Sequence, residues 1–262
     1  MKEILLQSNK GGLRAHIYFS DIEFNDIEKI YVCAPGMPSF LKKDFFENLL
    51  SKNKKLGFAV VYYYGYWFSS GDFSIKNCAD SLSDFVFYLR KGSFVDTFFD
   101  KKVNKFEGRI SLIGYSFGAN PLLRALDKIE VKDVEDIILV APLPIIHNLQ
   151  INDGSKEIAD FYSFNIEFAK FISNGYAELI RDKTGHELKD YFSGIHENSI
   201  VQPIDNFIDK IKLFYGNQDK MIPKIIIDQF VDKINIKNIK TIDGIGHSKY
   251  LIETAIKEIT RQ

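Results

Sequence analysis

Short apolar runs alternate with helical patterns along most of this chain. The apolar runs, rich in β-branched and aromatic residues, are 29–34, 58–64, 109–113, 136–141, 211–215 and 236–242. Most of them are continuously apolar, which is typical of strands buried on both faces of a parallel sheet. Helical spacing of apolar residues occurs between them in 39–51, 75–89 and 119–129, and Pro223 and Ser248 each begin another helical pattern. This order predicts an α/β fold with a doubly wound, mostly parallel sheet of about eight strands.

Two segments depart from the alternation. Residues 3–7 and 13–19 flank a turn-forming stretch, 9–12, and we expect them to form an N-terminal antiparallel hairpin. Residues 143–209 contain no convincing strand. Apolar side chains at helical spacing predict one helix on Phe161, Phe164, Phe168, Phe171 and Ile172, and a second short helix on Tyr176, Leu179 and Ile180. We therefore predict a single domain over 1–262, with 143–209 inserted in it as a helical cap.

Charge and composition exclude several classes of function. Lys and Arg number 34 and Asp and Glu number 35, so no basic surplus is present for gripping nucleic acid or an anionic membrane. The longest uncharged stretches, 56–71 and 137–152, are interrupted by Gly, Ser, Pro or His and fall short of the roughly 20 apolar residues of a membrane span. The N-terminus resembles no export signal. The 2 cysteines lack CxxC spacing, which favours a reducing cytoplasm over a disulfide framework or a thiolate metal site.

The candidate nucleophile is Ser116. It lies in Gly114-Tyr115-Ser116-Phe117-Gly118, between a predicted strand and a predicted helix. This is the strand, G-x-S-x-G, helix context of a nucleophile elbow, in which only small residues fit two positions before and after the serine. Chance would give the bare pattern in fewer than about one such chain in ten.

A serine hydroxyl needs a general base and an orienting acid to become a nucleophile at neutral pH. Of the 5 histidines, His247 is best placed, because it follows the last predicted strand and precedes the C-terminal helix. Asp219, after the penultimate strand, is the candidate acid, and Asp243 is the local alternative. The chain order Ser116, Asp219, His247 is that of α/β-hydrolases.

These motifs make the chain similar to the α/β-hydrolase superfamily over 29–141 and 211–262. The resemblance implies an oxyanion hole formed by the backbone N–H groups of Met37 and Phe117, with Pro35-Gly36 where the family often has His-Gly. The stretch 64–71 resembles a loop found in esterases and serine peptidases of this family, with Tyr64 where arginine is usual. Candidate substrate-pocket residues are Trp67 in that loop and Phe164 and Phe168 in the cap.

Together these features predict a serine hydrolase, carboxylesterase-like, that cleaves an ester of a small to medium apolar substrate through an acyl-enzyme. We expect neither a metal nor a cofactor, and the expected partner is a small-molecule ester or a short peptide. A serine peptidase or amidase acting on short peptides is the enzymatic alternative. A non-catalytic α/β-hydrolase scaffold is the other alternative, although such a scaffold has no need to keep Ser116, Asp219 and His247 together.

Overall fold

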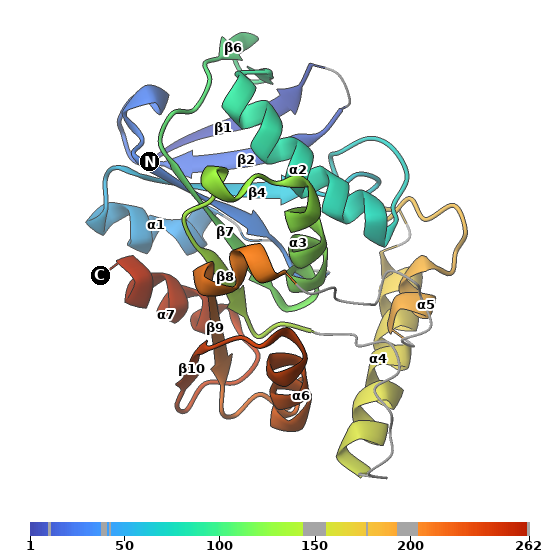
Figure 1. Ribbon diagram of the computed structural model, residues 1–262. Helices are drawn as coiled ribbons and strands as arrows, with labels where there is room; N and C mark the ends of the chain where they lie inside the picture. The colour runs from blue at the N-terminus through green and yellow to red at the C-terminus, as the bar shows by residue number, and fades with distance from the viewer. Residues whose placement is uncertain are drawn as a thin grey trace.

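A computed structural model describes residues 1–9, 12–37, 41, 43–143, 156–176, 178–192 and 204–260. Its centre is a ten-stranded sheet in the order β10-β9-β8-β7-β3-β4-β2-β1-β5-β6 (Figure 1). Six of these strands pair in parallel: β3 (Lys29–Ala34), β4 (Leu56–Tyr62), β7 (Arg109–Tyr115), β8 (Ile137–Val140), β9 (Ile211–Gly216) and β10 (Asn238–Ile242). The predicted α/β fold with a mostly parallel sheet is confirmed.

The remaining strands form an antiparallel extension at one side of the sheet. β1 (Lys2–Ser8) and β2 (Arg14–Phe19) form the predicted N-terminal hairpin, and β2 pairs antiparallel with β4. Beyond β1 lie β5 (Phe94–Asp96) and β6 (Lys101–Val103), which raise the strand number to ten from the predicted eight or so. Three residues are too few to show a strand periodicity, and lysines on β6 suit a sheet edge rather than a core.

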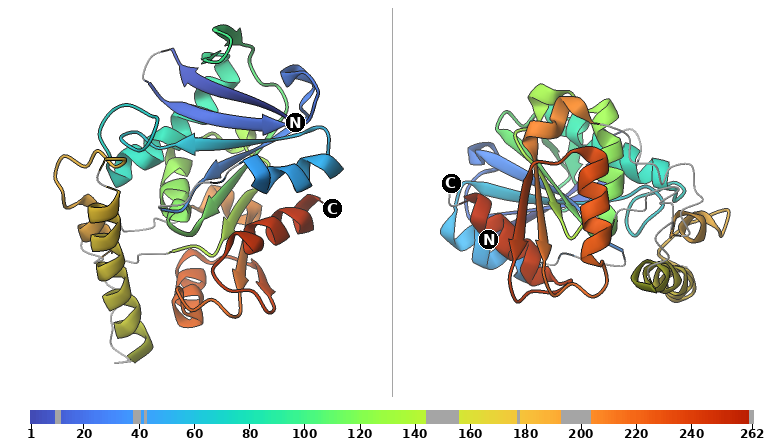
Figure 2. Two further views of the ribbon diagram at one scale, coloured as in Figure 1. Left: turned by 180° about the vertical axis from the view of Figure 1, so that it is seen from behind. Right: turned by 60° about the horizontal axis from the view of Figure 1, so that its bottom comes forward.

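Helices cover both faces of the sheet because successive strand residues point to opposite sides. α2 (Ile75–Lys91), α3 (Ala119–Ala125) and α6 (Lys224–Ile234) lie in front of the sheet in Figure 1. α1 (Lys43–Lys52) and α7 (Lys249–Thr260) cover the opposite face, as Figure 2 shows from behind. Val32 and Leu112 accordingly pack in the core under the first group, and Cys33 and Ile113 in the core under the second.

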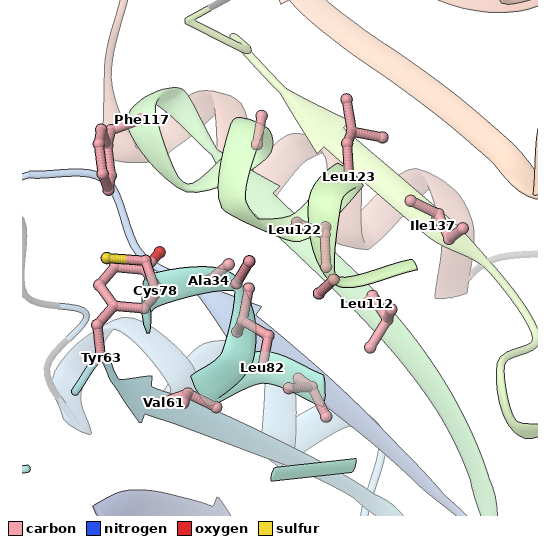
Figure 3. Packing of buried hydrophobic residues seen from close by; sticks show 14 of the residues in the cluster. Ala34, Val61, Tyr63, Cys78, Leu82, Leu112, Phe117, Leu122, Leu123 and Ile137 are labelled. Atoms are coloured by element: carbon pink, nitrogen blue, oxygen red, sulfur yellow. The ribbon is translucent and has the colours of Figure 1, made fainter. Parts of the chain in front are cut away.

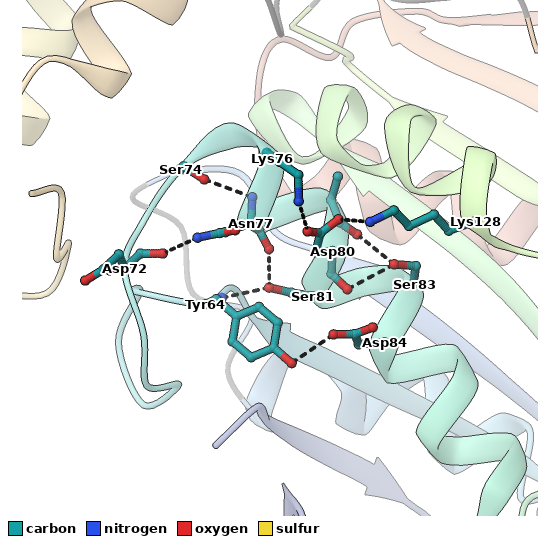
Figure 4. A network of polar contacts seen from close by, with 11 residues as sticks. Tyr64, Asp72, Ser74, Lys76, Asn77, Asp80, Ser81, Ser83, Asp84 and Lys128 are labelled. Carbon is teal, nitrogen blue, oxygen red and sulfur yellow. Dashed lines mark hydrogen bonds and ion pairs between the residues drawn. The ribbon is translucent and has the colours of Figure 1, made fainter. Parts of the chain in front are cut away.

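Hydrogen bonds tie the chain that follows β4 to the start of α2 (Figure 4). The Ser74 hydroxyl caps α2 by accepting from the Asn77 N–H at 3.0 Å. Ser81 Oγ accepts from the Tyr64 N–H at 2.7 Å, and Tyr64 Oη donates to Asp84 at 3.0 Å. Tyr64, which stands where the related loops carry arginine, therefore anchors this loop to a helix.

The 143–209 segment contributes α4 (Lys156–Gly175) and α5 (Glu187–Phe192) beside the end of the sheet toward which the parallel strands point (Figure 1). The predicted short helix on Tyr176, Leu179 and Ile180 is wrong, since Ile180 forms a β-bridge with Tyr66 and the second helix lies at α5. The N–H groups of Leu179 and Ile180 close a single turn on the Tyr176 carbonyl. The Leu179 carbonyl then accepts from the Trp67 N–H, and the Arg181 N–H donates to the Gly65 carbonyl, so the turn does not continue as a helix. No helix within the described ranges is long and apolar enough to cross a membrane.

Candidate active site

Ser116 lies on a strained turn between β7 and α3. Its φ of 51° is in the left-handed region, which is uncommon for a residue other than glycine and is concentrated at functional sites. The neighbouring residues Tyr115 and Phe117 are buried, whereas Ser116 is partly exposed. The turn therefore presents the serine hydroxyl at the carboxyl end of a central strand.

The two glycines of the motif are required by backbone packing. A Cβ at Gly114 would lie 2.7 Å from the Ala119 Cα, and one at Gly118 would lie 2.1 Å from the Ala34 carbonyl oxygen. Both distances are too short for any side chain, because the contacted atoms belong to the backbone and cannot move aside. The G-x-S-x-G spacing thus has the steric cause that the sequence predicts.

The structure brings Ser116, His247 and Asp219 into one hydrogen-bonded chain. His247 Nε2 lies 3.0 Å from Ser116 Oγ, and His247 Nδ1 lies 2.8 Å from Asp219 Oδ2. The His247 and Asp219 side chains are only 9% and 3% exposed. A carboxylate can only accept, so Nδ1 carries the proton and Nε2 of a neutral His247 is left to accept from the serine hydroxyl.

The Asp219 carboxylate is fixed by its own loop. Its Oδ1 accepts from the backbone N–H groups of Met221 and Ile222, both at 2.9 Å. The loop itself crosses the one that carries His247, where a Cβ at Gly216 would lie 2.0 Å from the Ile245 carbonyl oxygen. This close crossing places the acid and the histidine side by side.

Asp243, the alternative acid, is used differently. It accepts from the Asn217 side-chain amide at 2.9 Å, and the Asn217 amide oxygen accepts from the Gly244 N–H at 2.9 Å. These contacts join the loops after β9 and β10 without involving His247. Among the other histidines, His16 contacts Tyr62 and His186 is exposed, while His147 and His196 lie outside the described residues.

Tyr115 covers one side of the histidine. Its ring is stacked on His247, with 5.3 Å between ring centroids and 30° between planes. Burial and the nearby negative charge of Asp219 raise the pKa of Tyr115 to about 12. The ring is therefore neutral near neutral pH where it packs against the imidazole.

The loop after β3 approaches Ser116 directly. A Cβ at Gly36 would lie 3.2 Å from the Ser116 Cβ, so Pro35, Gly36 and Met37 pass over the serine. Met37 and Phe117 are both buried, and within the described residues the Met37 N–H donates to no acceptor. The segment that carries Met37 therefore lies against the serine turn that carries Phe117.

Comparison with solved structures identifies the fold. The α/β hydrolase GrgF from Penicillium sp. sh18 superposes with a TM-score of 0.61 at 16% identity, covering 100% of this chain and 96% of that one. The esterase EaEST from Exiguobacterium antarcticum gives 0.57 at 16% identity, covering 98% of each chain. A soluble variant of monoglyceride lipase from Saccharomyces cerevisiae gives 0.57 at 13% identity, covering 100% and 95%. The chain has the α/β-hydrolase fold. Its sequence matches no protein-family model and no curated protein.

Within this α/β-hydrolase fold, aromatic rings connect the 143–209 segment to the serine turn. The Phe117 ring lies 6.3 Å from Phe192 on α5, and Phe192 lies 6.0 Å from Phe168 on α4. Phe164 stacks on Phe168 at 5.8 Å and is itself 44% exposed. Two of the predicted pocket residues therefore form the outer part of a ring series that begins next to Ser116.

The third predicted pocket residue, Trp67, contacts the same segment elsewhere. The backbone N–H of Trp67 donates to the Leu179 carbonyl at 2.8 Å. Arg181, which the sequence analysis missed, donates to the backbone carbonyls of Trp67 at 3.3 Å, of Gly71 at 3.2 Å and of Ser69. No local sequence pattern relates Arg181 to a loop more than a hundred residues earlier, so these hydrogen bonds are visible only in the folded chain. No metal-binding group of three or more His, Cys, Asp or Glu occurs in the described parts of the chain.

Proposed function

We propose that this α/β-hydrolase-fold protein is a serine hydrolase that cleaves a carboxylic ester of a small to medium apolar substrate. The observation that carries the proposal is the hydrogen-bonded series of Ser116, His247 and Asp219, in which Ser116 lies on a strained turn. A structural turn has no need of a positive φ at a non-glycine residue whose hydroxyl faces a buried imidazole and carboxylate.

The reaction proceeds through an acyl-enzyme. Ser116 Oγ attacks the ester carbonyl carbon while His247 Nε2 takes the hydroxyl proton, and Asp219 stabilises the resulting imidazolium. The N–H groups of Met37 and Phe117 bind the oxyanion of the tetrahedral intermediate. His247 then protonates the departing alcohol, and water, activated by the same imidazole, releases the acid and restores Ser116.

Two observations favour an apolar ester. The rings of Phe168 and Phe164 lie beyond the buried Phe192, which contacts the residue after the nucleophile. Phe168 is partly exposed and Phe164 is 44% exposed, so both rings offer apolar surface to an acyl or alcohol group. The fold neighbours include proteins described as an esterase and a monoglyceride lipase. We further propose that 143–209 acts as a cap over the site within a single domain. The reduced, buried Cys33 and Cys78 are consistent with the cytoplasmic location that we propose.

The proposal is tested by turnover of matched substrates. Wild type and Ser116→Ala are incubated with a panel of aryl esters and aminoacyl amides, and kcat/KM is measured for each. Ester turnover that disappears in Ser116→Ala supports the proposal. Comparable turnover of amides would favour a peptidase or amidase, and turnover of neither class would favour the non-catalytic scaffold.

A further inference from the structure

The loop that carries the Met37 N–H must hold one conformation for an oxyanion hole to exist before substrate binds. It is held from below by the serine turn, because a Cβ at Gly118 would lie 2.1 Å from the Ala34 carbonyl oxygen and 2.7 Å from that of Pro35. Such contacts limit how far the loop can descend. They are van der Waals contacts and supply no hydrogen bond to the Pro35 carbonyl.

Tyr63 supplies an orienting contact. It directly follows β4, its side chain is fully buried, and its hydroxyl donates to the Pro35 carbonyl at 2.8 Å. Burial raises the pKa of the Tyr63 hydroxyl well above its ordinary value, so the group remains a protonated donor. One buried hydrogen bond therefore fixes the direction of the Pro35 carbonyl.

The direction of this carbonyl matters for the next residues. A peptide group is planar, so fixing the Pro35 oxygen also fixes the N–H of Gly36. Gly36 has no Cβ and is the most freely rotating residue of the loop, and Met37 follows it immediately. Without the Tyr63 bond, the Pro35–Gly36 peptide group could rotate, and this would shift Gly36 and the next peptide group, which contains the Met37 N–H.

The same side chain contacts the other N–H donor. The Tyr63 ring meets Phe117 edge to face at 6.1 Å, and Tyr191 of α5 meets Phe117 at 5.4 Å. Figure 3 shows Tyr63 and Phe117 at the same side of this part of the core. Tyr63 therefore touches the segments that carry both proposed oxyanion donors.

We propose that Tyr63 is a positioning residue for the oxyanion hole, acting through its hydrogen bond to the Pro35 carbonyl and its ring contact with Phe117. The inference rests on the proposed serine hydrolase function. It predicts an effect on transition-state stabilisation rather than on substrate binding or on the proton transfer through His247.

The test compares Tyr63→Phe with Tyr62→Phe. Tyr62 precedes Tyr63 in the chain, and its hydroxyl is hydrogen-bonded to His16 at 2.7 Å, so each variant removes one tyrosine hydroxyl with one partner. Rates are expressed per active site by titration with a fluorophosphonate, so that unfolded molecules do not count. Tyr63→Phe should lower kcat about 10-fold, less than the 10² to 10³ for complete loss of an oxyanion donor. KM should change by less than about twofold, because the groups that bind substrate are untouched. The shape of the pH profile should stay the same, because His247 is untouched.

Two more measurements separate positioning from general damage. The affinity of a trifluoromethyl ketone, which forms an oxyanion on the serine, should fall by the same factor as kcat/KM. Genetic incorporation of 3-fluorotyrosine at 63 keeps the hydroxyl and should restore kcat to within about twofold of wild type. Equal rates for Tyr63→Phe and Tyr62→Phe, or a kcat loss that fluorotyrosine fails to restore, would overturn the inference while leaving the hydrolase proposal intact. A wild-type protein that turns over no substrate would instead refute the proposed function.

Discussion

Replacing Asp219 with asparagine should disable the protein by reversing the tautomer of His247. Asp219 Oδ1 accepts from two backbone N–H groups, those of Met221 and Ile222. The asparagine oxygen will take the same place, because an NH₂ group there would face two donors. Its NH₂ group then faces His247 and donates to Nδ1, so Nε2 carries the proton and cannot accept one from Ser116.

The size of the effect follows from the cost of the productive orientation. Turning the amide to accept from His247 leaves two N–H groups without acceptors beside a side chain that is 3% exposed in its native form. Each such group costs about 1 to 3 kcal/mol, so the productive orientation lies roughly 2 to 6 kcal/mol higher. Since 1.4 kcal/mol corresponds to a factor of ten, kcat should fall between about 30-fold and 10⁴-fold.

The assay is ester hydrolysis per folded molecule at neutral pH, with Asp243→Asn as the matched control. Asp243 bonds to Asn217 and not to His247, so its variant should retain kcat within about threefold. Thermal unfolding checks that both variants fold. A kcat for Asp219→Asn within fivefold of wild type, or a larger loss in Asp243→Asn, would refute the reasoning.

Three further outcomes are expected. The double variant Ser116→Ala with His247→Ala should be hardly slower than either single variant, because the three residues act as a unit. A rate loss in the double variant equal to the product of the two single losses would contradict this. With p-nitrophenyl esters of increasing acyl length, kcat/KM should rise a few-fold per CH₂, which corresponds to up to about 0.8 kcal/mol, and then fall. Phe164→Ala or Phe168→Ala should move the acyl length of maximal kcat/KM to longer chains. Profiles unchanged in both variants would mean that the rings serve packing only. Arg181→Ala should lower the free energy of unfolding by about 1 kcal/mol in denaturant titration, since three carbonyls lose a donor. An unchanged midpoint of unfolding would show that the Arg181 hydrogen bonds do not stabilise the fold.

Local rules explain why the members of the candidate site could be proposed from the sequence. The serine turn is visible because Gly114 and Gly118 meet backbone atoms of their immediate structural neighbours, which leaves a fixed spacing in the chain. Asp219 follows the mostly apolar β9, and His247 follows β10, an exposed strand in which polar residues interrupt the isoleucines. The two strands pair in parallel, and the carboxyl ends of parallel strands share one edge of a sheet. These residues are therefore found by combining a short motif with strand order.

Features that depend on distant partners could not be predicted. β5 and β6 are short strands whose own residues show no strand pattern: β5 pairs with the edge of β1, and β6 pairs with β5. The turn at Leu179 and Ile180 looked helical because apolar spacing cannot register the hydrogen bonds that its backbone makes with Trp67 and Gly65. The bond from Tyr63 to Pro35 likewise joins two apolar segments, and neither contains a signal for the other.

Mapping the site of covalent labelling tests the central claim most directly. The protein is treated with a fluorophosphonate, digested, and analysed by tandem mass spectrometry, with Ser116→Ala as the control. One adduct per chain, located on Ser116 and absent from the variant, is the predicted result, because the Ser116 hydroxyl has an imidazole at 3.0 Å that is itself bonded to a carboxylate. An adduct on Ser70 or Ser248 with Ser116 unmodified, or no adduct at all, would contradict the assignment of Ser116 as the nucleophile.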